Sequence, residues 1–325
     1  MFSQKMIVEL KHLKSCILKC SFYLSMIKWK KFGLFIEPQR DRWWSLTHAM
    51  IPTPEALGKG IFRIYYSGRN ADNQSHITWA DVDLNEPFKV IGYSDSPVLT
   101  PGALGCFDDN GVTPSCLIDL PHGEKALYYI GWNPGSTVRI HLFGGLAISS
   151  DGGQTFERWS QAPILERTNI DPYLNTAPWV VPDGSGFRMF YVSGHEWIHK
   201  DLPRYNIKTA YSLDGKHWNR EGHICIDFKD DTENALARPY VVKEDGLWRM
   251  WFSYKSTNYR LGYAESTDGL SWERLDHLAG IDVNVSGFDS EMIEYGAVVS
   301  HEGRRFMFYN GNNYGFDGIG LAVEE

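Results

Sequence analysis

The side chains in this sequence that could do chemistry fall in five short polar segments. The richest segment, "GCFDDNGVTPS", places Asp108, Asp109 and Asn110 beside a glycine. The comparable residues elsewhere are His48, Asn175, Glu233 with Arg238, and Asp289, Glu291 and Glu294. Two carboxyl groups held about 5–5.5 Å or about 6.5–9.5 Å apart can cleave a glycosidic bond with retention or inversion. Glycosidic chemistry is therefore one hypothesis, and a tight turn is the alternative explanation of Asp108 and Asp109.

A second set of polar and aromatic residues accompanies these segments. Its members are Arg69, Asn70, Trp132, Asn133, His195, Glu196, Trp197, Tyr254, Lys255, Asn310 and Asn312. Amides, carboxylates and guanidinium groups bind hydroxyls through paired hydrogen bonds, and an indole offers an apolar face to a sugar ring. Each residue alone is typical of a solvated loop, but five such sets facing one axis favour a binding site.

These segments belong to a repeated unit of about sixty residues. One phrase recurs five times, for example as "IFRIYYSGRN" (61–70), "KALYYIGWN" (125–133) and "LWRMWFSYKS" (247–256). Short apolar runs rich in β-branched and aromatic residues precede and follow each copy, which is typical of strands separated by turns. Three such strands and a fourth after a turn make a propeller blade. The sequence therefore predicts an all-β, five-bladed β-propeller with four-stranded antiparallel blades.

The predicted domain spans residues 27–325, and its two ends are expected to meet. The fifth unit stops at its third strand, so "KFGLFIEP" (31–38) is predicted to add the fourth strand and close the ring. Residues 1–26 are predicted to be a poorly ordered extension, with a membrane-surface helix as the alternative and Met26 as a candidate start. Lysines interrupt its apolar runs, so neither a signal peptide nor a membrane span is predicted.

Three Asp-Gly turns, at Asp151, Asp214 and Asp268, resemble catalytic signatures but have a structural explanation. Glycine accepts the positive φ of a tight hairpin turn, and aspartate can bind nearby backbone amides. In a propeller these turns would join third and fourth strands on the face away from the central pocket. The aromatic residues that follow them are expected to pack between adjacent blades: Phe156, Trp218 and Trp272.

The composition argues against several function classes. A formal charge of -8 and a pI near 5.8 disfavour nucleic-acid binding, which depends on clustered basic residues. The five cysteines form no CxxC pair, which is typical of reduced thiols in a cytoplasmic protein. No phosphate loop or dinucleotide fingerprint predicts a cofactor. His48, His195 and His199 lack metal-ligand spacing, so no metal is predicted.

The repeat, the "SLDGKHW" (212–218) and "STDGLSW" (266–272) turns and the "FDDNGVTPS" segment resemble the five-bladed propeller glycosidases. That group contains glycoside hydrolase families 43 and 32 and the family 130 phosphorylases. The chain also looks like glycosidase-like proteins associated with bacterial surface-polysaccharide synthesis. The resemblance implies acidic residues before the first strands of the early blades. Asp109 is the best match, but the first blade has Ser45, Thr47 and His48 there, and the third has Asn175 in place of glutamate.

The resemblance leads to a glycoside hydrolase-like enzyme. Asp109 would be the base, and Glu291 or Glu233 would be an acid whose pKa is raised by burial and a neighbouring carboxylate. An alternative is an intracellular glycosyltransferase or phosphorylase, which needs only one protein acid or base. The cations that suit its phosphate, nucleotide diphosphate or acidic sugar are Arg69, His195, Arg238 and Lys255. A third possibility is a non-catalytic sugar-binding propeller. The expected ligand is a carbohydrate or sugar phosphate.

Overall fold

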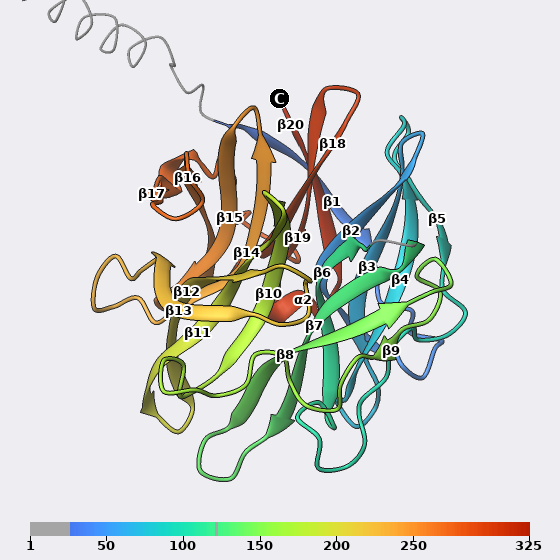
Figure 1. Ribbon diagram of the computed structural model, residues 1–325. Helices are drawn as coiled ribbons and strands as arrows, with labels where there is room; N and C mark the ends of the chain where they lie inside the picture. The colour runs from blue at the N-terminus through green and yellow to red at the C-terminus, as the bar shows by residue number, and fades with distance from the viewer. Residues whose placement is uncertain (1–26, 121–122) are drawn as a thin grey trace, which may run out of the picture.

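The computed structural model describes residues 27–120 and 123–325, and most of this part of the chain forms β-strands (Figure 1). The all-β prediction is confirmed. The predicted N-terminal extension lies outside the described residues. The helical segments η2 (Asp276–Leu278) and α2 (Asn312–Gly315) are each about one turn long. Within the described ranges, no helix is long and apolar enough to cross a membrane.

The strands pair antiparallel in groups of four. The first group is β2 (Thr47–Gly58), β3 (Ile61–Arg69), β4 (Ser75–Asp83) and β5 (Lys89–Tyr93). The second is β6 (Gly111–Asp119), β7 (Lys125–Pro134), β8 (Ile140–Ser149) and β9 (Glu157–Arg158). The third is β10 (Asn175–Asp183), β11 (Gly186–His199), β12 (Leu202–Ser212) and β13 (Asn219–Ile226).

Two further groups follow the same order. The fourth is β14 (Ala235–Glu244), β15 (Leu247–Lys255), β16 (Tyr259–Ser266) and β17 (Glu273–Arg274). The last is β18 (Glu294–His301), β19 (Arg304–Asn310), β20 (Ile319–Glu324) and β1 (Trp29–Ile36). Strand β1 overlaps the segment predicted to complete the last unit. The chain therefore pairs its first described strand with its final one.

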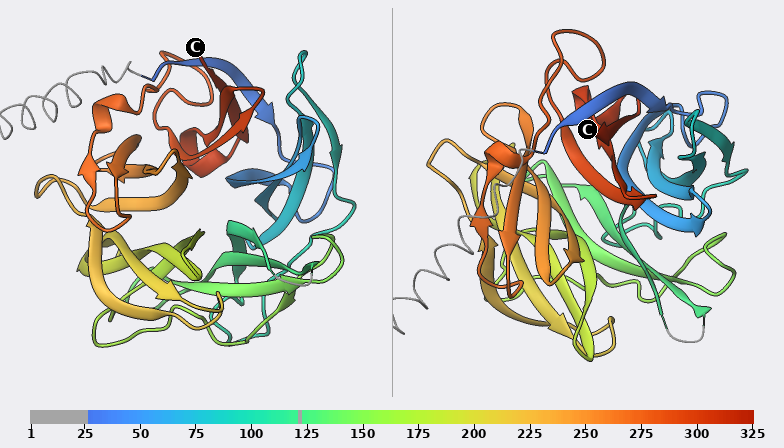
Figure 2. Two further views of the ribbon diagram at one scale, coloured as in Figure 1. Left: turned by 45° about the horizontal axis from the view of Figure 1, so that its top comes forward. Right: turned by 90° about the horizontal axis from the view of Figure 1, so that it is seen from above.

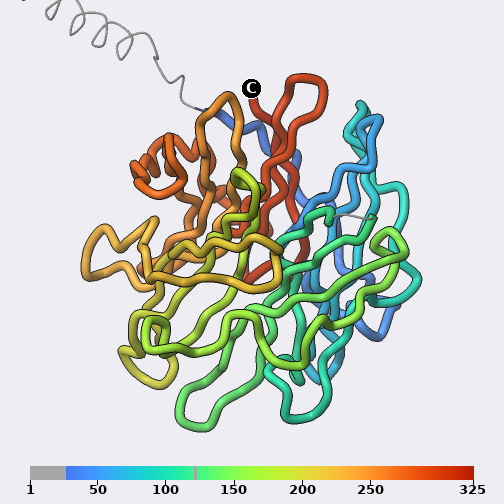
Figure 3. Tube along the Cα trace, viewed as in Figure 1, coloured from blue at the N-terminus to red at the C-terminus, as the bar shows by residue number. Residues whose placement is uncertain are grey.

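The first strands of the groups lie together at the centre of the molecule. Strands β2, β6, β10, β14 and β18 contact one another in cyclic order, with β18 beside β2 (Figure 2). Single parallel bridges join the first four groups into one sheet of 16 strands, and the last group is a separate sheet of four. The bridges are Ser75–Gly111, Phe143–Asn175 and Tyr205–Ala235. This arrangement brings residues far apart in sequence to one central region, as the trace in Figure 3 also shows.

Burial changes from the inner to the outer strand of each group. The inner strand β10 reads NTAPWVVPD and is buried over its first six residues. The outer strand β1 reads WKKFGLFI and alternates between exposed and at least partly buried residues, with Lys30, Phe32 and Leu34 exposed. A strand covered on both faces needs a continuous apolar run, whereas a strand with one solvated face alternates. The apolar pattern therefore determines which strand lies at the centre.

The Asp-Gly turns join the third and fourth strands of their groups and hold their own backbone. The carboxylate of Asp214 accepts hydrogen bonds from the backbone N–H groups of Lys216 and His217, both at 2.9 Å. Asp151 and Asp268 repeat this arrangement. The aromatic residues after the turns pack against the preceding group, in the pairs Phe156–Tyr65, Trp218–Tyr128 and Trp272–Phe190. These turns therefore connect neighbouring groups of strands.

Candidate functional site

Every first strand breaks its pairing register near its beginning. The breaks lie between Met50 and Thr53, Pro114 and Cys116, Thr176 and Trp179, Ala237 and Tyr240, and Glu294 and Ala297. A β-bulge of this kind bends the strand and changes the direction of its side chains. Five equivalent residues, each directly before a proline or before Gly296, consequently line one pocket: Ile51, Thr113, Ala177, Arg238 and Tyr295.

Four of these residues have a left-handed backbone. The φ angles are 55° at Ile51, 48° at Ala177, 48° at Arg238 and 56° at Tyr295. Such angles are costly for bulky residues and persist only where the surroundings hold them. The Asn310 amide accepts a hydrogen bond from the Ile51 N–H at 2.8 Å and donates to the Ala49 carbonyl at 2.7 Å. Ser253 Oγ accepts from the Tyr295 N–H at 2.8 Å. Asn310, a predicted substrate ligand, thus supports the pocket wall.

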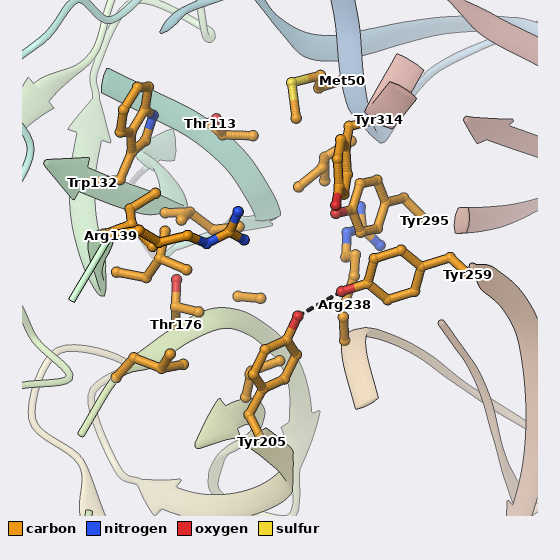
Figure 4. Close-up of a pocket in the computed structure, with 18 of the residues that line it drawn as sticks. Met50, Thr113, Trp132, Arg139, Thr176, Tyr205, Arg238, Tyr259, Tyr295 and Tyr314 are labelled. Atoms are coloured by element: carbon orange, nitrogen blue, oxygen red, sulfur yellow. Dashed lines mark hydrogen bonds between the residues drawn. The ribbon is translucent and has the colours of Figure 1, made fainter. Parts of the chain in front are cut away.

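The central pocket has a volume of about 400 Å³, which is in the range of small-molecule sites. Its polar and aromatic lining comprises Arg69, Asn73, Arg139, Arg238, Thr113, Thr176, Trp132, Tyr205, Tyr259, Tyr295 and Tyr314. Figure 4 labels all of these except Arg69 and Asn73. Arg69, Trp132 and Arg238 are the predicted site residues in this lining. Among residues 27–120 and 123–325, no aspartate or glutamate lines the pocket. The site is therefore cationic and aromatic in a chain whose formal charge is -8.

Arg238 is the most deeply buried cation of the pocket, with 1% of its surface exposed. Its Nη2 donates to the Pro52 carbonyl at 2.6 Å and to Thr53 Oγ1 at 3.2 Å. Its Nε and Nη1 atoms are buried and have no hydrogen-bond partner among the described residues. Burial lowers the pKa of this guanidinium to about 10. Arg238 therefore keeps donors that the surrounding chain does not use.

Arg69 and Arg139 add positive charge to the pocket. Arg69 donates from Nη1 to Asn73 Oδ1 at 2.8 Å, and its buried Nε has no partner in the described structure. Its guanidinium carbon lies 5.7 Å from the centre of the Trp132 ring. Arg139 directly precedes β8, and its side chain points into the pocket (Figure 4). Both side chains can thus contact a bound molecule.

Neighbouring titratable groups respond to these arginines. Burial and then the charge of Arg69 lower the pKa of His48 to about 4. Burial and then the charge of Arg139 lower the pKa of Lys255, a predicted ligand that stands over the Tyr259 ring. His48 is therefore neutral at pH 7, and the positive potential of the site disfavours further protonation.

Four tyrosines form the opposite wall, with a buried carboxyl group next to them. The hydroxyls of Tyr205 and Tyr259 are 2.5 Å apart. Glu294 is fully buried, and neither of its carboxyl oxygens has a hydrogen-bond partner among the described residues. Burial raises the pKa of Glu294 well above its usual range, although Tyr295 and Lys255 favour the ionised form. Burial therefore favours the protonated form of Glu294, which directly precedes the pocket-lining Tyr295.

Four carboxylates that precede the first strands are held in buried ion pairs. The pairs are Asp108–Arg158 at 2.8 Å, Asp171–Lys208 at 2.8 Å, Glu233–Arg274 at 2.6 Å and Asp289–Lys31 at 2.7 Å. Each cation comes from the third or fourth strand of the same group. In three groups a tyrosine of the second strand also donates to the carboxylate: Tyr129, Tyr191 and Tyr309. None of these four carboxylates lines the central pocket.

The structure does not bring the predicted pair of Asp109 with Glu291 or Glu233 to the pocket. Asp109 is half-buried and accepts a hydrogen bond from the Gly105 N–H at 2.8 Å, which closes a tight turn. The neighbouring Asn110 donates its backbone N–H to the second strand. Glu291 is exposed, and only its backbone groups form hydrogen bonds in the described structure.

Two further predicted ligands lie away from the pocket lining. Asn175 is fully buried, and its side-chain amide donates to the carbonyls of Glu166 and Asp171. His195 is exposed and lies with its ring edge against Phe228, at 6.0 Å between ring centres. Asn175 therefore stabilises its own loop, and His195 belongs to the outer surface.

Five charged or aromatic pocket residues are absent from the predicted site: Arg139, Tyr205, Tyr259, Tyr295 and Tyr314. Arg139, Tyr205 and Tyr259 lie at or near the beginnings of third strands, and Tyr205 bridges the first strand of the next group. Comparing the third strands of the repeat would point to these positions. Tyr295 corresponds to the residues before proline in the other first strands, so its alignment with them is a second usable signal.

No cluster of three or more His, Cys, Asp or Glu side chains in the described part of the chain is arranged to hold a metal ion. No family model matches the chain. The chain is 42% identical over 299 residues to the uncharacterized protein Rv1502 of Mycobacterium tuberculosis, covering 91% of this chain and 99% of that protein.

Solved structures show the fold to which the chain is similar. A structure described as a glycoside hydrolase has a TM-score of 0.73 and 20% identity, with 100% of this chain and 96% of that chain covered. A thermostable family-43 glycoside hydrolase has a TM-score of 0.58 and 15% identity, with 85% and 89% covered. The chain therefore belongs to the family of the Mycobacterium tuberculosis protein Rv1502 and has the fold of the propeller glycoside hydrolases.

Proposed function

We propose that this protein is a carbohydrate-active, glycoside hydrolase-like enzyme that acts on a glycosidic bond in the central pocket. The observation that carries the proposal is the meeting of all five first strands at one pocket that combines Trp132 and four tyrosines with arginines. Aromatic faces pack against sugar rings, and phenol and guanidinium groups bind their hydroxyls. In this proposal the five groups of strands are the blades of a five-bladed propeller, closed where β1 pairs with β20.

We assign the acid function to Glu294, acting through Tyr295. Burial raises the pKa of Glu294 well above its ordinary value and so favours the protonated form, and the next residue, Tyr295, lies in the pocket wall. The Tyr295 hydroxyl would donate its proton to the glycosidic oxygen and receive one from Glu294 while the bond from that oxygen to the sugar carbon breaks. Water would then attack the carbon, and the proton it loses would return to Glu294 through the Tyr295 hydroxyl. Asp109, Glu233 and Glu291 have no part in this assignment because neither they nor their chain neighbours line the described pocket, whereas Glu294 directly precedes the pocket residue Tyr295.

Glycosyl transfer or phosphorolysis is the second candidate. The supporting observation is that no carboxylate lines the pocket among the described residues, whereas three arginines do. A hydrolase usually needs two carboxyl groups. In a transferase or phosphorylase, the acceptor or the phosphate takes the place of the second group. Phosphate would then be a substrate and would bind near the arginines.

Product analysis with the full chain tests the proposal. Oligosaccharides and aryl glycosides of neutral and acidic sugars would be incubated with and without inorganic phosphate. Turnover without phosphate supports hydrolysis, and sugar phosphate formed only with phosphate supports phosphorolysis. We expect Glu294→Gln to lower kcat by about 10²-fold or more, as for loss of a general acid. The matched control is Glu291→Gln, three residues away and exposed, which should leave turnover unchanged. Saturable sugar binding without any turnover would overturn the enzyme proposal in favour of a binding protein.

A further inference from the structure

We infer that the central pocket is built for a negatively charged sugar, whose carboxylate or phosphate oxygens bind between Arg238, Arg69 and Arg139. This inference rests on the proposal that the pocket takes a carbohydrate, and it adds the charge class of that carbohydrate. Guanidinium groups present paired N–H donors that match both carboxylate and phosphate oxygens. The two kinds of anion therefore share one recognition chemistry.

The first argument is the unsatisfied state of Arg238. Removing a cation from water is unfavourable unless an anion or sufficient hydrogen bonds compensate. Arg238 is 1% exposed, forms no ion pair with a described carboxylate, and leaves Nε and Nη1 without partners. The rings of Trp179 and Tyr240, at 5.1 and 5.4 Å, give partial compensation. A bound anion would complete the environment of this residue.

The second argument is the contrast with other well-buried arginines. Arg158, Arg220 and Arg274 each pair with one or two carboxylates. Buried arginines outside the pocket therefore have carboxylate partners within the fold. In the pocket, Arg69 also has a buried Nε without a partner among the described residues. Unpaired arginines therefore gather at the same site from different groups of strands.

The third argument is the distribution of apolar and charged surface around the site. The Arg69 guanidinium stands over the Trp132 ring. Tyr259, Tyr295 and Tyr314 lie across the pocket from Trp132 (Figure 4). A sugar ring can therefore contact aromatic faces while its charged substituent reaches the guanidinium groups. The lowered pKa values of His48 and Lys255 reflect burial together with uncompensated positive charge from Arg69 and Arg139. A bound anion would raise both pKa values.

Calorimetric titration of the full chain tests this inference. The probes are inorganic phosphate, glucose 1-phosphate, glucuronic acid, the corresponding neutral sugar glucose, and acidic and neutral oligosaccharides. We expect an anionic probe to bind at least about tenfold more tightly than its neutral counterpart, with an affinity that falls as salt increases. Binding of the phosphate probes alone identifies a sugar phosphate, and binding of the uronic-acid probes alone identifies an acidic sugar.

Three variants locate the binding. Arg69→Met and Arg139→Met should each weaken binding of the anionic probe about 10- to 100-fold, as expected for a lost charge-assisted hydrogen bond, and should weaken neutral-sugar binding by a clearly smaller factor. The matched control is Arg304→Met, which removes a half-exposed arginine paired with Glu86. This variant should change the affinity for neither the anionic nor the neutral probe. Equal binding of neutral and anionic probes overturns the inference but preserves the proposed function. Failure of every probe to bind overturns both.

Discussion

The buried carboxylate pairs and the central pocket use charged residues in opposite ways. Beside the first strands, Asp108, Asp171, Glu233 and Asp289 each have a cation within 2.8 Å. In the pocket, arginines from several groups of strands have no described carboxylate partner. A carboxylate in a polar segment therefore does not indicate a catalytic site when a cation from its own group of strands pairs with it. The unpaired groups are Arg238, which lines the pocket, and Glu294, which is buried directly before the pocket residue Tyr295.

Breaking a carboxylate pair should have the largest effect on stability. Asp171 is fully buried and accepts from Lys208 and Arg220, so Asp171→Asn would leave Lys208 without its anion and Arg220 with only the exposed Glu166. We expect the free energy of unfolding to fall by about 3–5 kcal/mol. Urea denaturation measures this value. As a control, Asp119→Asn removes an exposed partner of Lys125 and should cost about 1 kcal/mol or less.

Removing the unpaired cation should have a much smaller effect on the free protein. Arg238→Met removes the unfavourable burial of a charge, which stabilises the free protein. It also removes the hydrogen bonds to Pro52 and Thr53, which destabilises it. We expect the free energy of unfolding to change by about 1 kcal/mol or less in either direction. Denaturation without and with an anionic ligand is the measurement. A decrease in the free energy of unfolding as large as that of Asp171→Asn would show that Arg238 has a structural role. It would then not differ from the paired carboxylates in its contribution to stability.

The pH dependence of stability should distinguish Glu294 from the paired carboxylates. The pKa of Glu294 is raised above its ordinary value of 4.5, so above that pH the unfolded chain releases a proton that the native state keeps. Stability therefore declines as pH rises from about 4.5 towards the native pKa. Glu294→Gln cannot ionise, and its Tm relative to wild type should increase from pH 4.5 to pH 8. A constant difference across this range would contradict the buried, protonated state.

Asp171 should show the opposite sign. Its pairing, mainly with Lys208, outweighs burial and lowers its pKa below the ordinary value of 3.8. Its stabilisation is present above pH 3.8 and is lost as pH falls through the native pKa. The Tm difference between wild type and Asp171→Asn should therefore shrink in acid. The two variants together test whether paired and unpaired carboxyl groups behave differently.

The smallest effect is expected at the Asp-Gly turns. Asp214→Ala removes acceptors for the backbone N–H groups of Lys216 and His217 on an exposed loop. We expect the free energy of unfolding to fall by roughly 1 kcal/mol or less and ligand affinity to remain unchanged. Thermal unfolding and calorimetry measure the two quantities. A large loss of binding would assign this face a functional role and would contradict the structural interpretation of the turns.

Part of the site can be predicted because the repeat places equivalent residues at equivalent depths. Arg69 and Trp132 end second strands, and Arg238 directly precedes a proline in a first strand, so their common location follows from aligning the units. Aligning the units does not show whether Glu233 is free for catalysis, because it does not reveal the cation that pairs with it. Its partner Arg274 is 41 residues away, on the short outer strand β17. Sequence spacing alone does not indicate that this arginine reaches it.

The strands, the turns and the order of the repeated units could be predicted from the sequence, because apolar alternation and the turn preference of Asp-Gly act over short distances. Which charged side chains form ion pairs is visible only in the tertiary structure. Lys31 reaches Asp289 across 258 positions of the chain, and the left-handed bulge at Tyr295 turns that side chain into the pocket beside Glu294. Pairing and burial depend on distances between groups that only the folded chain defines, and they separate structural carboxylates from the residues available to a ligand.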